Sequence, residues 1–137
     1  VNMSVEMDLY NAAAELIRNR YPQGWGGAAA VRTSTGRILT SIAPDTKNDA
    51  LALCMEVGAY LEAHKLEETV THSLCIYRDD EVSNFKILTP CGICQERLVH
   101  WGGDALAAVT NPDNKLIFKS VRELQPFHWS GVNGGEL

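Results

Sequence analysis

Pro90-Cys91-Gly92-Ile93-Cys94, together with Cys54-Met55-Glu56 upstream, is the stretch that decides the fold of this chain. Pro90 is suited to setting the entry into a helix, so both following cysteines are expected on its first turn. The N-terminus of a helix carries free N–H groups and a partial positive charge, which lower the pKa of thiols and stabilise thiolates. Cys54 and Glu56 are expected at or near the start of a second helix. The two helix starts are therefore predicted to face one metal ion.

Three thiolates from Cys54, Cys91 and Cys94 suit a catalytic Zn²⁺ site, in which three protein ligands leave a fourth position open. Glu56 stands two residues from a ligand, close enough to act as general acid and base without binding the metal. This residue set therefore predicts metal-assisted hydrolysis.

Other interpretations of the cysteines remain open. Cys91 and Cys94 alone suit a redox pair, although no thioredoxin-like context surrounds them. A closed structural zinc site needs a fourth ligand, for which His64 and His72 are the nearest candidates. Two disulfides in a secreted protein are a further alternative. Cys75 lies in an apolar run, which favours packing as a small hydrophobic residue.

Length and composition indicate one domain spanning residues 1–137, with the ordinary composition of a globular protein. The net charge of −5 argues against a nucleic-acid partner, because binding the phosphate backbone needs a basic face. No apolar stretch is long enough for a membrane span, and the first residues do not resemble a secretion signal. A cytoplasmic location without membrane association is expected.

The hydrophobic pattern alternates between helical and extended periods. Helices are predicted at residues 4–20, 49–65 and 91–101, and Ser120 with Glu123 forms a capping box that opens a short last helix. Extended segments are predicted at residues 27–33, 37–42, 72–78, 85–88, 105–110 and 115–119. This order favours an α/β sandwich, in which helices cover the faces of a sheet.

The motifs resemble those of the cytidine deaminase family, including its blasticidin-S deaminase members. Two further stretches extend the likeness over nearly the whole chain. Trp25-Gly26-Gly27-Ala28-Ala29 is similar to the family's aromatic-x-x-Gly-Ala stretch, and Glu123-Leu124-Gln125-Pro126-Phe127 to its Glu-Leu-Leu-Pro-aromatic tail. The resemblance implies a three-layer α/β/α sandwich around a mixed five-stranded sheet, a homotetramer, and a Zn²⁺-dependent hydrolase. Its substrate would be a free cytosine nucleoside or an analogue, such as cytidine, deoxycytidine or a blasticidin-S-like nucleoside, with ammonia as product.

The resemblance also implies roles for single residues. Cys54, Cys91 and Cys94 would hold the zinc, and Glu56 would carry protons from water to the ring nitrogen and the leaving amine. Trp25 is a candidate apolar wall for the base, and Phe127 a candidate cap over the cavity, either of its own or of a neighbouring subunit. Both aromatic residues are equally suited to plain packing.

The chain departs from the family pattern in two places. Where cytidine deaminases carry Asn-x-Glu to hold the ribose, this chain has Ala43-Pro44-Asp45. Ala43 offers no hydrogen bond, so weaker ribose binding is expected, and Asp45 favours a cationic substituent on the substrate. Val57 and Gln95 replace two arginines near the thiolates, so helix dipoles and backbone N–H groups must offset the negative charge at the metal.

Two other functions compete with a nucleoside deaminase. A catalytically decayed, zinc-stabilised interaction protein on the same fold would keep the cysteines, but would have little reason to keep Glu56. A deaminase of polynucleotides or tRNA is disfavoured by the acidic charge, the short chain and a first ligand that is Cys rather than His.

Overall fold

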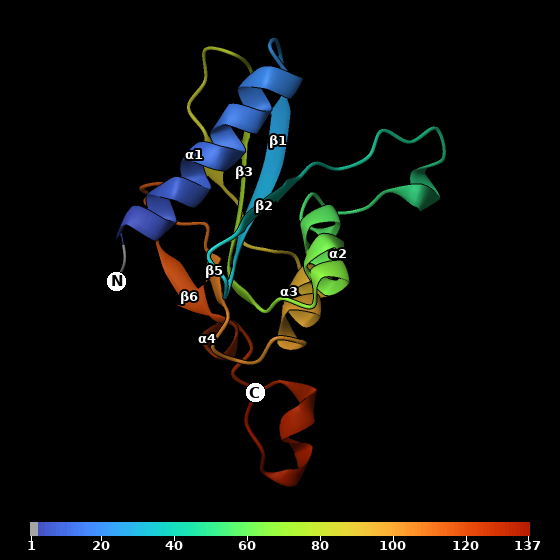
Figure 1. Ribbon diagram of the computed structural model, residues 1–137, viewed down its shortest axis with the longest axis vertical. Coiled ribbons are helices and arrows are strands. Elements are labelled where there is room, and N and C mark those ends of the chain that lie inside the picture. Colours follow the sequence, from blue (N-terminus) through green and yellow to red (C-terminus); the bar gives the residue numbers. More distant parts are fainter. Residues whose placement is uncertain (1–2) are drawn as a thin grey trace.

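A computed structural model describes residues 3–137 of the chain (Figure 1). The helices are α1 (Met3–Arg20), α2 (Val57–Leu66), α3 (Gly92–Val99) and α4 (Val121–Leu124), with short 3₁₀ helices η1 (Asp49–Leu51) and η2 (Trp129–Asn133). The strands are β1 (Gly26–Thr33), β2 (Ile38–Ser41), β3 (Val70–Arg78), β4 (Lys86–Ile87), β5 (Leu106–Ala108) and β6 (Phe118–Ser120).

One mixed sheet organises these elements, in the order β2-β1-β3-β5-β6. Strand β3 runs parallel to β5 and antiparallel to β1, which makes the sheet mixed as the family resemblance implied. The resemblance implied five strands and the structure has six, because residues 86–87, within the extended segment predicted at residues 85–88, pair with β3. A parallel pair needs a crossover connection, and the connection from β3 to β5 contains α3. The topology thus brings the Cys91–Cys94 helix back onto the sheet.

Helices cover both faces of the sheet, which confirms the three-layer α/β/α sandwich. Helix α1 packs on one face, and α2 and α3 lie on the other (Figure 1). Strand β1 contributes to both layers, since Ala28 and Ala30 pack with α1 whereas Val31 packs with α2 and α3. Successive side chains of a strand point to opposite faces. A strand covered on both sides is therefore apolar throughout, which explains the buried run from Gly26 to Val31.

The predicted helix at residues 49–65 is wrong in its first half. The structure ends a 3₁₀ helix at Leu51 and begins α2 only at Val57. The Asn48 side chain accepts a hydrogen bond from the Ala50 N–H, which caps the short helix locally. A turn follows, closed by the Val57 N–H donating to the Cys54 carbonyl at 3.2 Å. Cys54 and Glu56 therefore lie in the turn that leads into α2.

The remaining helices follow the sequence prediction more closely. The helix expected at residues 91–101 is observed as α3, and α4 begins with the predicted capping box of Ser120 and Glu123. The segment between β2 and α2 carries η1 and reaches away from the sandwich (Figure 1). No helix among residues 3–137 combines the length and the apolar character that crossing a bilayer requires.

Candidate active site

The structure brings the three predicted thiols into one cluster. The Sγ atoms of Cys54 and Cys91 are 3.3 Å apart, and those of Cys54, Cys91 and Cys94 all lie within 4.8 Å of one another. Cys94 is buried and Cys91 is exposed, so the cluster spans from the core to the surface. Two sulfurs bound at about 2.3 Å to one tetrahedral zinc are roughly 3.8 Å apart, between the 3.3 Å of the Cys54–Cys91 pair and the 4.8 Å limit of the cluster. The donor set and its spread therefore fit Zn²⁺.

Helix α3 supplies two of these thiols from its N-terminus. Cys91 is the N-cap, with extended backbone at φ −63° and ψ 167°, and Cys94 lies on the first turn. Burial by itself would raise the pKa of the Cys91 thiol. The backbone N–H groups of Cys94 and Ile93, together with the neighbouring thiols, nevertheless bring this pKa below its usual value. Unpaired N–H groups at a helix start thus favour a thiolate, as the sequence predicted.

The turn that carries Cys54 is held against the sheet from two sides. The Ser41 hydroxyl on β2 donates to the Met55 carbonyl at 2.5 Å. The Met55 side chain packs onto β1 at Gly27, where a Cβ would come within 2.5 Å of the Met55 sulfur. A side chain at position 27 would displace the Met55 thioether, so Gly27 lets Met55 of the Cys-Met-Glu turn pack closely against the sheet.

Glu56 is buried beside the thiols, with 4% of the residue exposed. Its Oε2 has no hydrogen-bond partner among the described residues. Burial, and then the adjacent Glu56 carboxylate, raise the pKa of both Cys94 and Cys75 well above the usual thiol value. A buried carboxylate oxygen without a donor is costly unless a ligand supplies one. This oxygen is therefore suited to accept a proton from a bound water or substrate.

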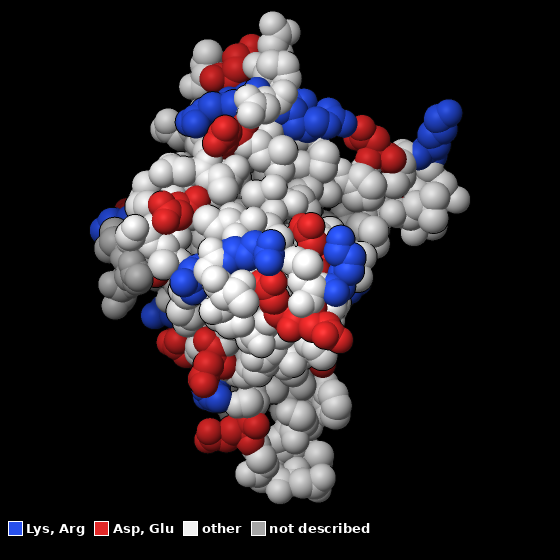
Figure 2. Space-filling model, viewed as in Figure 1, with Lys and Arg blue, Asp and Glu red and all other residues white. Residues whose placement is uncertain are grey.

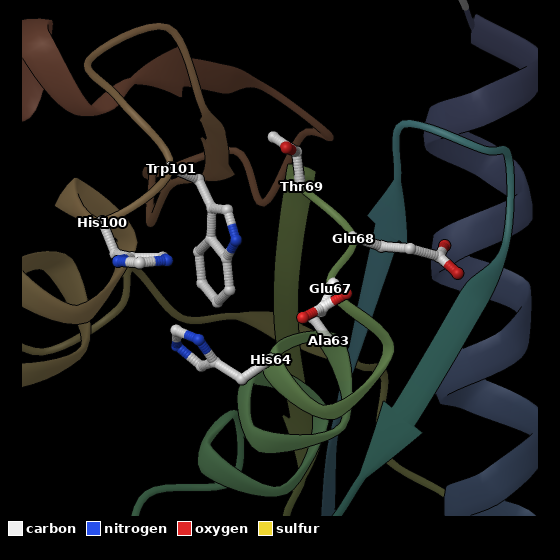
Figure 3. A pocket seen from close by; sticks show the side chains of 7 residues that line it. All are labelled: Ala63, His64, Glu67, Glu68, Thr69, His100 and Trp101. Carbon is white, nitrogen blue, oxygen red and sulfur yellow. The ribbon is translucent and has the colours of Figure 1, made fainter.

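Neither histidine considered for a closed zinc site lies with the thiols. Figure 3 shows His64 facing His100 and Trp101. The centroid of its ring is 4.6 Å from that of His100 and 4.7 Å from that of Trp101, and these residues line a separate cavity of about 460 Å³. The His72 ring packs on Phe118, and its Nδ1 bonds the Thr71 hydroxyl at 2.9 Å. Within residues 3–137, only the three cysteines form a group with metal-ligand spacing. Neither of these two histidines is therefore grouped with the thiols.

A cavity of about 320 Å³ opens over the thiols and Glu56. Of the predicted substrate contacts, Trp25 and Ala43 line it. Asp45 does not line it; its carboxylate binds the Arg20 guanidinium on α1 at 3.1 Å, and 87% of its side chain is exposed. Phe127 is 97% exposed in the tail beyond α4 and is likewise outside the lining. The roles of these four residues in binding substrate stay predictions.

Several lining residues were not anticipated from the sequence as substrate contacts. Leu53 and Met55 flank Cys54, Leu88 and Thr89 precede Pro90, and Cys75 comes from β3. Four of them lie within the metal motifs or at most two residues from them, and this closeness in the sequence could have indicated their place in the lining. Cys75 is not adjacent to either motif in the sequence, so nothing indicated its place in the lining. It is on β3, and the pairing of β3 with β1 brings it near the Cys54 turn.

The two positions without arginine are filled in different ways. Val57 is buried in the core between α2 and α3. Gln95 donates from Nε2 to the Pro90 carbonyl at 2.8 Å and accepts from the Gln125 side-chain amide. Neutral amides thus connect the segment before Cys91 to the chain after α4, without adding positive charge.

No family model matches this chain. A curated relative, blasticidin-S deaminase of Bacillus cereus, is 23% identical over 130 residues, covering 91% of this chain and 92% of the relative. The crystal structure of cytidine deaminase from Bacillus anthracis superposes with a TM-score of 0.92 at 51% identity, covering 94% of this chain and 92% of that one. Cytidine deaminase from Mycobacterium leprae shares the fold at a TM-score of 0.68 and 21% identity, over 92% of this chain and 98% of that chain.

The Bacillus anthracis relative is 51% identical to this chain over nearly the full length of both, which is close enough to indicate a common family. The sequence motifs, the sandwich and the clustered thiols all agree with it. This chain belongs to the cytidine deaminase family.

Proposed function

We propose that this chain is a zinc-dependent hydrolase that removes the amino group of a free cytosine nucleoside or analogue and releases ammonia. The observation that carries this proposal is the buried, unpaired Glu56 carboxylate oxygen beside three clustered thiols. Proteins similar to this chain are named cytidine deaminase and blasticidin-S deaminase, which supports the same reaction class.

The chemistry divides between the metal and Glu56. Zinc held by Cys54, Cys91 and Cys94 would supply a Lewis acid that lowers the pKa of a bound water toward about 7. Glu56 accepts the proton of the attacking water and delivers it to the ring nitrogen, which makes C4 more electrophilic. The same carboxylate then takes the proton of the hydroxyl added at C4 and passes it to the leaving amine, which departs as ammonia. Because Glu56 is buried, bulk water does not compete for these transfers.

The chain's own backbone offsets the charge of three thiolates. The N–H groups at the start of α3 already lower the pKa of Cys91. The Gln125–Gln95–Pro90 hydrogen bonds hold the backbone that leads into this helix start. Outer contacts of this kind orient metal ligands and tune the metal. We propose that they replace the arginines that other family members carry.

A decayed, zinc-stabilised interaction protein is the alternative. Such a protein gains nothing from a buried carboxylate without a donor, which lowers stability unless a ligand pairs with it. The intact cavity above Glu56 also favours a working enzyme.

The test is ammonia release by the zinc-loaded protein. Cytidine, deoxycytidine, blasticidin S and free aminopyrimidines are offered separately, and release is followed with a coupled ammonia assay. At least one compound is expected to turn over, with stoichiometric loss of the cytosine absorbance. A zinc-loaded, folded protein that releases ammonia from none of them supports the decayed alternative and refutes the proposed function.

The assembly state rests on the family resemblance and on exposed apolar side chains. Leu61 on α2 is 61% exposed, and Ile93 on α3 is 64% exposed. Figure 2 shows the charged side chains of one face spread among uncharged surface. Helix faces that expose large apolar residues are typical of interfaces. We propose a homotetramer assembled through α2 and α3.

Light scattering of the purified protein is expected to give about four times the 15.0 kDa chain mass. Leu61→Glu should reduce that mass by placing a charge in the apolar contact, whereas Val82→Glu should not. Val82 is the matched control because it is 89% exposed in the loop after β3. A stable monomer with full activity contradicts the tetramer.

A further inference from the structure

We infer that Arg78 and Glu81 are positioning residues of this active site, although neither lines the cavity over Glu56. They hold residues 21–25 in place and thereby keep the Trp25 indole at the wall of that cavity. The inference rests on the proposed deaminase function and adds to it two side chains that act on substrate binding through Trp25.

Residues 21–25 connect α1 to β1 without belonging to a helix or a strand. Trp25, at the end of this segment, lines the cavity, and 50% of the residue is exposed. The Tyr21 ring meets the indole edge-on, with ring centroids 5.8 Å apart and an angle of 69° between the planes. Because no ladder of backbone hydrogen bonds fixes such a segment, its place depends on contacts from neighbouring elements.

Arg78 ends β3 and supplies the first of these contacts. Its Nη2 donates to the Tyr21 carbonyl at 2.7 Å, and only 5% of the residue is exposed. The guanidinium also lies over the Phe85 ring, 5.7 Å from the centroid, whereas Nε has no hydrogen-bond partner among the described residues. A buried cation that is only partly paired is often no more stabilising than an apolar side chain of similar volume. The bond to Tyr21 is therefore the contribution of Arg78 that an apolar side chain would lack.

Glu81 supplies the second contact, from the loop that follows β3. Its Oε2 accepts the Gly24 N–H at 2.9 Å, and this bond lowers the pKa of the Glu81 carboxyl, so the acceptor stays ionised at neutral pH. Gly24 has a φ of 78°, which favours glycine. Figure 1 shows the loop after β3 beside the turn from α1 to β1. The residue directly before Trp25 is thus anchored to this loop.

Loss of either bond is expected to weaken substrate binding more than the chemical step. Glu56 and the three thiols come from the turn before α2 and the start of α3, which neither bond touches. A wall that contacts substrate and transition state equally well contributes to KM and leaves kcat unchanged. A general loss of folded protein would instead lower the apparent kcat and leave KM unchanged. The two kinetic constants therefore separate positioning from stability.

The main variant is Arg78→Met, which keeps a long apolar stem over Phe85 and removes the donor to Tyr21. Ammonia release is measured with the zinc-loaded full chain and the best substrate among cytidine, deoxycytidine and blasticidin S. KM is expected to rise at least about threefold, while kcat stays within about twofold. Arg78→Lys retains a cationic donor on a long side chain, so its KM is expected to be closer to that of the unaltered protein. An unchanged KM in Arg78→Met, or a fall in kcat alone, overturns the inference.

A double-mutant cycle with Trp25 tests whether Arg78 acts through the indole. In a Trp25→Ala protein, Arg78→Met is expected to change KM by less than about 1.5-fold, because the group that it positions is already gone. An equal rise in KM with and without the indole shows that Arg78 acts elsewhere and contradicts the positioning role.

Glu81 offers a second test that leaves the core intact. Glu81→Ala removes the acceptor of the Gly24 N–H and is expected to raise KM, whereas Glu81→Gln keeps an amide oxygen and is expected to stay within about twofold of the unaltered protein. Asp79→Ala is the matched control, because it removes the exposed ion pair that joins the same loop to Lys86. A KM as high in Asp79→Ala as in Glu81→Ala rules out a specific role for Glu81.

Hydrogen exchange tests the positioning without turnover. The Gly24 amide is expected to exchange at least about tenfold faster in Glu81→Ala than in Asp79→Ala, because its acceptor is gone. Equal exchange rates overturn the anchoring of Gly24. Ammonia release from none of the three compounds is the separate result that refutes the proposed function, and the exchange rates then still decide whether Glu81 holds the segment.

Discussion

Glu56→Gln is expected to keep zinc and the fold but to lose deamination activity by at least about 10²–10⁴-fold, the usual contribution of a general acid or base. Glutamine retains the size of the side chain and an oxygen acceptor, but it does not take up a proton. Oε2 of Glu56 is the oxygen that is free to take up the proton, since no described residue forms a hydrogen bond with it. The loss is expected to lie at the upper end because one carboxylate serves several proton transfers.

The measurement pairs steady-state ammonia release with metal analysis and thermal unfolding of the same samples. Glu62→Gln is the matched control, because Glu62 lies on α2 but outside the cavity lining. The control should retain activity within about twofold, because this half-buried carboxylate does not line the cavity over Glu56. Near-normal turnover by Glu56→Gln removes this residue from the mechanism.

Replacing Cys91 and Cys94 together by serine is expected to reduce bound zinc from about one equivalent per chain to almost none, because a single thiol is left from the three-ligand site. Activity should fall below detection, since the metal is required to activate water. Serine hydroxyls remain protonated at neutral pH and do not replace thiolate ligands. The readout is metal content after extensive dialysis, independent of any substrate.

Cys75→Ala provides the control for general loss of cysteine. Cys75 is buried on β3 with its sulfur 4.0 Å from the Met55 sulfur, and it does not belong to the three-thiol group. This variant should keep its full zinc content. Full zinc in the Cys91→Ser, Cys94→Ser protein is the outcome that contradicts the metal assignment.

The sequence was sufficient where local rules decide the structure. Proline before a helix, thiols at the helix start and a capping box at Ser120 act within a few residues, and each is observed, although Cys91 is the N-cap and only Cys94 lies on the first turn. Alternating helical and extended periods predicted the layered α/β architecture. The observed sheet has one strand more than the five that the family resemblance implied, namely β4. This strand has only two residues, too few to show an alternating hydrophobic pattern in the sequence.

At residues 49–65, hydrogen bonds and packing outweighed the helical periodicity on which the predicted helix was based. Helical spacing continued through the segment, but the Asn48 cap closes a 3₁₀ turn after three residues. Ser41 on β2 then binds the Met55 carbonyl, and Met55 packs on Gly27. These contacts cross from one element to another, so helical periodicity carries no trace of them.

The sequence by itself identified the family and predicted the candidate metal ligands and Glu56, because these depend on which residues are present and on short spacings between them. Only the tertiary structure decided what surrounds the ligands. It placed Leu53, Leu88 and Cys75 around one cavity, left His64 with Trp101, and joined Asp45 to Arg20 on another helix. The lining of the cavity is set by such long-range contacts, whose partners are selected by the packing of strands and helices and not by their distance along the chain.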